Sequence, residues 1–353
     1  MLEPSDIVAG VMLTALVVYT LTGGADFGGG VWDLFATGPR RLEQRRRIAH
    51  AIAPIWEANH VWLIVVVVLM FVCFPPAFAA VSIALHVPIT IMLFGVVLRG
   101  ASFVFRAYDP KNDDEATGPW RLVFAVSSAV TPVMLGIILG AIASGSFRFE
   151  PDSQRVVTDF FSEWAAAFPV MVGLYGLALC ALLAAVYLIH DTADSPTLQA
   201  DFRVRALIAA FAMGPLAFGT LLVARLGAPH VYETLMDSTW ALPIHMVTGA
   251  AAIGVIIALW TRRYRLARGL AVLQTVGIFS GFGAAQHPHI VAPSLTFSAA
   301  ASPDHVLWTV LGVLGMGAIP MLPAFFWLYR VFKGNRSAAT SDVTGAAPDA
   351  RDA

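Results

Sequence analysis

Two carboxylic acids stand inside apolar stretches of this sequence, where a charged group is costly. Asp26 lies in "LTGGADFGGGVWD", and Glu57 lies in "APIWEANHVWLI", which continues as "VVVVLMFVCF". A charge at the centre of a membrane helix costs about 2.5–3.5 kcal/mol on insertion scales. A carboxylate kept at such a position can relay protons, because it can gain and lose one. Asp26 and Glu57 are therefore the first candidates for chemistry.

Polar residues accompany Glu57 at helical spacing. A step of 100° per residue places Trp56, Glu57, Asn59 and His60 on one arc of about 160°. This arc predicts a polar face turned into the protein and away from lipid. The run of valines at 65–68 continues the same segment beyond the arc.

Small residues surround Asp26. Gly24 and Gly28 form a G-x-x-x-G pair, which lets a second helix approach closely. We expect helix packing at this face, and we expect the surface that meets a partner to include it.

The composition predicts the elements that position these residues. The 353-residue chain is 58% hydrophobic and 13% charged, whereas soluble domains carry roughly a quarter charged residues. Barrel strands alternate in polarity, and these uniformly apolar runs do not. The sequence thus predicts an all-α integral membrane protein with nine transmembrane helices, at about residues 7–35, 51–73, 79–99, 121–143, 166–188, 206–226, 239–260, 269–285 and 305–329.

Positive residues predict the orientation of these helices. Of the 22 Lys and Arg residues, 19 fall on one side of the nine segments, which places the N-terminus outside and the C-terminus in the cytoplasm. By helical rise, Asp26 then lies about 12–14 Å and Glu57 about 9 Å from the cytoplasmic helix ends. The short arginine-rich loop between their segments predicts that the two helices are antiparallel neighbours.

The remaining composition excludes several classes. A net charge of −1 gives no sign of nucleic-acid binding, and Cys73 and Cys180 lack metal-type spacing. The segments and their loops predict one transmembrane domain over residues 1–335. The polar, periodless residues 336–353 predict a disordered cytoplasmic tail.

The histidines predict neither a haem nor a metal site. His60, His86 and His245 are those within or near apolar segments, and they form no matched pair of haem ligands. His287 and His289 share one loop without a third ligand at sensible spacing, so we expect a structural or surface role.

Several alternatives remain open from the residues alone. Glu57 can snorkel to the nearby interface or pair with an arginine such as Arg99, and Asp26 can be purely structural. A proton-coupled secondary transporter also has buried carboxylates and glycine-broken helices. Transporters often have paired breaks in two halves, however, whereas the glycine-rich break appears once here.

Longer motifs resemble a known family. "LTGGADFGGGVWDL" followed by "RRRIAHAIAPIWEANHVWLI" resembles the first two helices of subunit II of cytochrome bd-type ubiquinol oxidases. The resemblance continues in "VLRGASFVFR", "HPHIVAPSLTFSAAASPDHVLWTVLG" and "LPAFFWLYRVFKG". The form "GGADFGGG", with glycines on both sides of "ADF", is most similar to the cyanide-insensitive branch.

The resemblance implies a fold, partners and cofactors. It implies two four-helix bundles plus one peripheral helix, in the bacterial cytoplasmic membrane. The complex oxidises ubiquinol and reduces O₂ to water. Its partner subunit I holds haem b and, in many members, haem d, whereas this subunit ligates no haem or metal. A small third subunit is a further partner in some complexes, and membrane lipid surrounds the assembly.

The resemblance also implies a proton path from the cytoplasm to the oxygen-reducing haem. Asp26 and Glu57 match the acidic residues of the two motifs, and Arg99 matches an arginine that would tune them. Trp56 and Asn59 would line or order the path.

The sequence departs from the family at two positions. Gly23 and Val104 stand where many members have a further acid. We therefore expect a path with fewer fixed acids, in which water fills the gap or the route differs.

Overall fold

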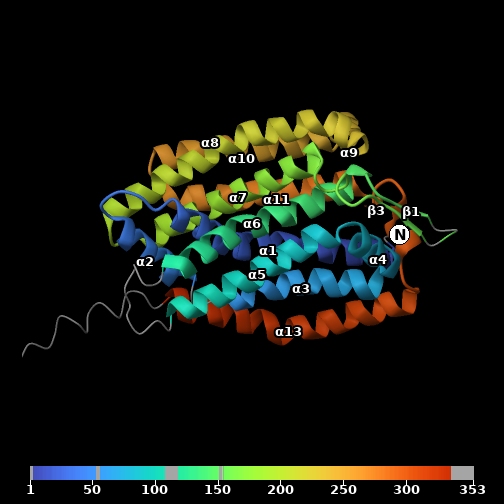
Figure 1. Cartoon of the computed structure of the whole chain (residues 1–353), viewed down its shortest axis with the longest axis horizontal. Helices are drawn as coiled ribbons and strands as arrows, with labels where there is room; N and C mark the ends of the chain where they lie inside the picture. The colour runs from blue at the N-terminus through green and yellow to red at the C-terminus, as the bar shows by residue number, and fades with distance from the viewer. Residues whose placement is uncertain (1–2, 53–55, 108–117, 151–152, 154, 335–353) are drawn as a thin grey trace, which may run out of the picture. The chain divides into compact units, whose positions relative to one another are not determined.

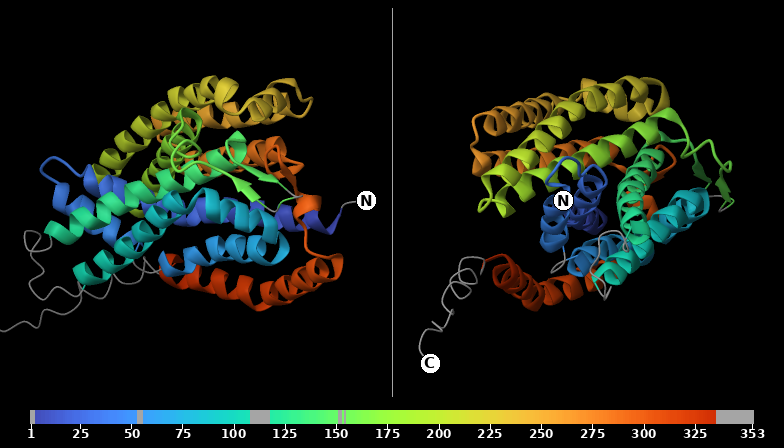
Figure 2. Two further views of the ribbon diagram at one scale, coloured as in Figure 1. Left: turned by 45° about the vertical axis from the view of Figure 1, so that its right-hand side comes forward. Right: turned by 60° about the vertical axis from the view of Figure 1, so that its left-hand side comes forward.

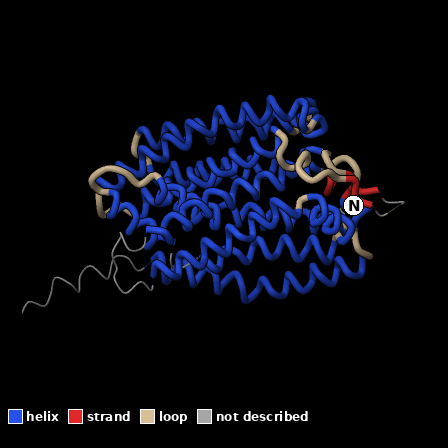
Figure 3. The backbone as a smooth tube through the Cα atoms, viewed as in Figure 1, coloured by secondary structure: helices blue, strands red, loops and turns tan. Residues whose placement is uncertain are grey.

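The computed structural model describes residues 3–52, 56–107, 118–150, 153 and 155–334 (Figure 1). Helices dominate this part of the chain, and its four short strands gather at the end of the bundle where the chain begins (Figure 3). The chain divides into two units, Met1–Ser302 and Pro303–Ala353.

The first unit contains twelve helices and two small antiparallel strand pairs within the described residues. The helices are α1 Pro4–Leu34, α2 Arg41–Ile52, α3 Trp56–Cys73, α4 Pro75–Ala84, α5 His86–Ala107, α6 Gly118–Ser144, α7 Ala167–Asp191, α8 Pro196–Gly227, α9 Pro229–Asp237, α10 Ala241–Trp260, α11 Tyr264–Gln286 and α12 Phe297–Ala300. The strands are β1 Arg148–Glu150 with β2 Arg155–Val157, and β3 His289–Val291 with β4 Leu295–Thr296. The second unit contains α13, Asp304–Gly334.

The predicted spans correspond to these helices. By length and composition, eight helices of the described residues can cross a membrane, and α2 with α3 is a ninth candidate if the bent pair counts as one span. In a bilayer, backbone N–H and C=O groups must form hydrogen bonds within the segment, because lipid offers no partners. Apolar runs of this length therefore form helices. The predicted tail, 336–353, lies outside the described residues.

The predicted segment 79–99 is wrong in its bounds, because the structure divides this region into α4 and α5 at Leu85. Pro88 explains the break. It has no N–H to donate, and within one continuous helix its ring would clash with the carbonyl group of Ala84. The sequence reading also missed two shorter helices, α2 in the arginine-rich loop and α9.

The core of the first unit centres on α7. Residues 179–189 of this helix are largely buried, and α7 packs against α1, α6, α8 and α11. Helix α10 packs against α11 and α8, and Figure 2 shows α8 and α10 as neighbours. A helix that is apolar all round, as α7 is, suits such a central position. Helix α1 also packs against α3, and α5 packs against α6.

The loop that contains the paired histidines folds back onto the start of α1. His287 Nε2 lies 3.2 Å from the carboxylate of Asp6. The rings of His289 and His230 lie 5.1 Å apart. Burial, together with the charges of His230 and His287, lowers the pKa of His289 below its ordinary value.

Candidate functional site

Three polar residues of α1 form a buried stripe along one side of the helix. Tyr19, Asp26 and Asp33 are spaced by seven residues, which is close to two helical turns. Their side chains are 4%, 6% and 1% exposed. We call these three residues the polar stripe of α1. Buried polar groups require partners, so their neighbours define the candidate site.

Asp26 has a close amide partner on α3. The Nδ2 group of Asn59 donates a hydrogen bond to Oδ2 of Asp26 over 2.5 Å, and Asn59 is 1% exposed. The structure therefore brings together two of the residues predicted from separate motifs. An amide that donates to a carboxylate stabilises its charged form.

Arg99 supplies a buried positive charge beside this pair. Its side chain is 2% exposed, and its guanidinium carbon lies 4.9 Å from the ring centre of Phe27 and 5.5 Å from that of Phe124. The aromatic faces contribute cation–π attraction, and the charge interacts with the carboxylate of Asp26. A buried arginine needs such an opposite charge to offset its desolvation.

Tyr19 extends the site towards the other end of α1. Its hydroxyl lies 3.3 Å from Nδ1 of His60 on α3, within hydrogen-bonding distance. The ring of Phe27 makes edge contacts with both residues. His60 thus belongs to the polar side of α3, as the predicted arc required. Sequence reasoning did not select Tyr19, although its seven-residue offset from Asp26 was a usable signal.

Asp33 and Arg106 form a second acid–arginine pair near the C-terminal ends of α1 and α5. Arg106 Nη2 lies 3.8 Å from Asp33 Oδ1, and the Arg106 side chain is 17% exposed. From the sequence alone, Arg106 counted only among the positive residues of one side, and Asp33 had no assigned role. Their positions, seven residues after Arg99 and Asp26, were the signal that would have found them.

Glu57 does not join the buried cluster. It is exposed on the surface of this chain, whereas Asn59, two residues later, is buried. Glu57 and Asn59 stand at opposite ends of the predicted 160° arc, so a helix face centred on Asn59 leaves Glu57 outside. Trp56 begins α3, and its side chain lies outside the part of the chain that the structure describes.

The positions of the two missing acids lie in different surroundings. Gly23 is on the polar side of α1, where an added Cβ would lie 3.0 Å from the ring of Tyr19. Val104 is 42% exposed. A further acid at position 23 would therefore adjoin the polar stripe, and one at position 104 would face outwards.

Gly24 and Gly28 face the opposite side, against α7. A Cβ built on Gly28 would lie 2.0 Å from the carbonyl oxygen of Cys180, and one on Gly24 would lie 3.2 Å from the Cys180 sulfur. In the next turn, the indole of Trp32 donates to the carbonyl oxygen of Ala181 over 2.7 Å. We call Gly24 and Gly28 the glycine face of α1. This face packs α1 closely against α7 of the same chain.

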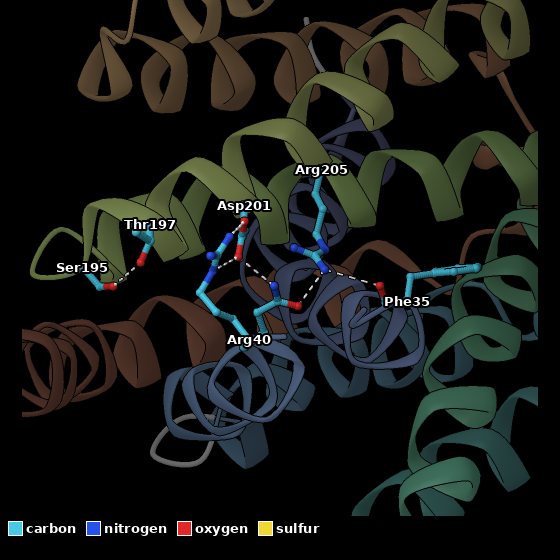
Figure 4. Close-up of polar contacts among 7 residues, drawn as sticks. Phe35, Arg40, Ser195, Thr197, Asp201 and Arg205 are labelled. Carbon is cyan, nitrogen blue, oxygen red and sulfur yellow. Dashed lines mark hydrogen bonds and ion pairs between the residues drawn. The ribbon is translucent and has the colours of Figure 1, made fainter. Parts of the chain in front are cut away.

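A second polar network fixes α2 to α8 near the ends of the helices (Figure 4). Arg40 donates two hydrogen bonds to Asp201, of 2.9 and 2.6 Å, and Gln44 donates a third to the same carboxylate over 2.8 Å. Arg205 donates to Gln44 over 2.8 Å and to the carbonyl oxygen of Phe35 over 3.4 Å. The bond to Asp201 raises the pKa of Arg40, so this pair is charged throughout the ordinary pH range. The network ties the start of α2 and the end of α1 to α8.

The three histidines within or near the predicted spans lie in different surroundings. His60 is bonded to Tyr19, Nδ1 of His86 lies 2.9 Å from the carbonyl oxygen of Ile83, and His245 is exposed. Over the described residues, no three His, Cys, Asp or Glu side chains gather as metal ligands.

Comparisons with known proteins identify the family. The sequence profile described as "Cytochrome bd terminal oxidase subunit II" matches residues 4–332. The chain belongs to this family. It is thus a multi-pass membrane subunit of a bacterial respiratory quinol oxidase, an oxidoreductase complex.

Individual relatives agree with this assignment. The chain is 21% identical over 328 residues to a putative cytochrome bd menaquinol oxidase subunit II of Bacillus subtilis, covering 89% of this chain and 91% of the relative. It is 25% identical over 196 residues to subunit 2 of the cytochrome bd-I ubiquinol oxidase of Escherichia coli K12, covering 55% and 51%. Both quinols occur in these names, so ubiquinol stays a prediction for this chain.

A solved structure shares the fold. A chain of the bd oxidase from Geobacillus thermodenitrificans superimposes with a TM-score of 0.73 at 18% identity. The match covers 94% of this chain and 99% of that one.

Proposed function

We propose that this subunit carries protons from the cytoplasm towards the oxygen-reducing haem of subunit I, besides supporting assembly of the complex. The observation that carries the proposal is the buried contact of Asp26 with Asn59 beside Arg99. Reduction of O₂ to water consumes protons, and a titratable group buried at membrane depth marks a proton route.

In this proposal, Asp26 has a different role from Asn59 and Arg99. Asp26 takes up a proton at its carboxylate and releases it onwards. Asn59 and Arg99 do not transfer protons, and they hold the carboxylate in place through a hydrogen bond and a nearby positive charge. The rings of Phe27 and Phe124 cover Arg99 and keep bulk water from it.

The exposed Glu57 extends the route to the partner. A carboxylate at membrane depth facing lipid is costly, so a polar surface of subunit I would cover it. Trp56, which precedes it, would help to order this exit. Haem b and, where the complex contains it, haem d would be held by subunit I, where ubiquinol is oxidised, and this chain would provide no haem ligands.

The arrangement in the membrane completes the proposal. We infer two four-helix bundles and one peripheral helix, with the N-terminus outside and the C-terminus in the cytoplasm. The excess of Lys and Arg at one end of the helices supports this orientation, because cytoplasmic loops are rich in positive residues. The ends of α1 and α5 that carry Asp33 and Arg106 would then lie on the cytoplasmic side.

The rival to proton transfer is a purely structural Asp26, and one substitution separates the two. In the purified two-subunit complex, Asp26→Asn keeps hydrogen-bonding capacity but cannot carry a proton. We expect parental haem content and a fall in oxygen consumption per haem of about 100-fold. Asp26→Glu should retain much more activity. A parental rate for Asp26→Asn would refute the proton path, and loss of haem from both variants would establish the structural role.

A further inference from the structure

Asp33 stands where an acid is doubly unfavourable. It is 1% exposed, and it lies in the last turn of α1, at the negative end of the helix dipole. A nearby positive charge offsets these costs, since Arg106 of α5 lies 3.8 Å away.

The Asp33–Arg106 pair repeats the Asp26–Arg99 pair. Asp33 follows Asp26 by seven residues on α1, and Arg106 follows Arg99 by seven on α5. The second acid and the second arginine therefore each lie about 10.5 Å further along their helix than the first. The ring of Phe124 lies against both arginines, 5.5 Å from Arg99 and 5.3 Å from Arg106. The two acid–arginine pairs therefore lie on one side of α1, one above the other.

A buried hydroxyl lies between the two layers. Gly30 stands between Asp26 and Asp33 on the same side of α1, and a Cβ built on it would lie 2.2 Å from the hydroxyl oxygen of Ser128. Ser128 is fully buried, and its hydroxyl has no hydrogen-bond partner among the described residues. A serine hydroxyl both donates and accepts, so it can pass a proton along a hydrogen-bonded chain.

We propose that Asp33 is the cytoplasmic entry acid of the proton path and that Ser128 connects it to Asp26. This inference rests on the proposed function of Asp26. The Asp33 carboxylate takes a proton from cytoplasmic water and gives it up towards Ser128. The hydroxyl accepts that proton and donates its own onwards to Asp26, with water completing the chain. Each group returns to its starting state, and Arg106 positions the entry carboxylate.

The test is Asp33→Asn in the intact two-subunit complex. The amide keeps the size of the side chain and loses the titratable proton, so haem content should stay at the parental level. Oxygen consumption per haem should fall by about tenfold or more. The ratio of rates in H₂O and D₂O should rise, because proton uptake becomes limiting, and a structural role would not change that ratio. Asp33→Glu should restore most of the rate.

Asp201→Asn is the matched control. It also removes a carboxylate bonded to an arginine near the same ends of the helices, but it lies in the α2–α8 network, away from the stripe. It should leave both the rate per haem and the isotope ratio at parental values. An equal slowing in Asp201→Asn would overturn the specific role of Asp33.

Ser128→Ala provides a second test, which can be made even if Asp33→Asn fails to assemble. Removing a buried hydroxyl without a protein partner should leave the complex intact, slow turnover several-fold and raise the isotope ratio. Parental turnover of Ser128→Ala, or of an assembled Asp33→Asn, would overturn this entry route. If Asp26→Asn is slow while Asp33→Asn is not, the entry route falls and the function proposed for Asp26 stands. If neither is slow, both fall.

Discussion

Two faces of the same helix do different work in this subunit. The glycine face of α1 meets the backbone of α7 so closely that a single methyl group on Gly28 would overlap the carbonyl oxygen of Cys180. About 140–180° around the helix, the polar stripe meets side chains of α3 and α5. Close backbone contact holds α1 against α7, whereas side-chain hydrogen bonds and charge pairs hold the polar stripe.

The comparison changes the expected role of the small residues. The sequence suggested that the small face of α1 belongs to the surface that meets the partner. The structure instead uses Gly24 and Gly28 against α7 of the same chain. Glu57 on α3 is exposed, so it stays a candidate for the surface that meets the partner.

Overlap at the glycine face should have the largest effect. Gly28→Leu forces α1 away from α7, and even Gly28→Ala places a Cβ 2.0 Å from a backbone oxygen. We expect Gly28→Leu to abolish recovery of the complex, and Gly28→Ala to cost at least about 1–3 kcal/mol of stability. Haem recovered per amount of membrane protein measures the recovery of the complex, and its melting temperature measures the loss of stability. Normal melting of Gly28→Ala would show that α1 and α7 do not pack this closely.

Loss of the exposed acid should have an intermediate effect, on rate alone. If Glu57 carries protons as we propose, Glu57→Gln removes that carrier without disturbing the buried core. The complex should then assemble with parental haem and consume oxygen about tenfold more slowly. Glu57→Asp should retain much more activity. The measurement is quinol-driven oxygen consumption per haem across pH 6–8. A parental rate for Glu57→Gln would remove Glu57 from the path, and lost assembly would give it a structural role.

A small change on the glycine face should have the smallest effect. In Gly24→Ala the new Cβ lies 3.2 Å from the Cys180 sulfur, a side-chain contact that can shift by a few tenths of an ångström. We expect a loss of no more than about 1 kcal/mol and parental turnover. Gly10→Ala, which meets nothing within 4 Å, is the control and should melt like the parent. If Gly24→Ala destabilised the complex as much as Gly28→Ala, the contrast between backbone and side-chain contact would be wrong.

Much of the site was readable from the sequence, because burial of polar residues in apolar runs is a local signal. The motifs led to Asp26, Asn59 and Arg99, which come together in the fold. Asp33 escaped notice because it stands at the end of an apolar run, where an acid resembles an ordinary interfacial residue. Only its contact with Arg106, across 73 residues of sequence, distinguishes it.

By itself the sequence determined the membrane helices, their approximate bounds and the motifs of the family, since apolar length and residue spacing are properties of a single segment. The tertiary structure decided which face of each helix points where. Gly28 meets α7, Asn59 turns in towards Asp26, and Glu57 turns out. The physical reason is that a helix presents several polar and small faces at once. Which one is buried depends on the neighbours that pack against it, and these come from segments far apart in the chain.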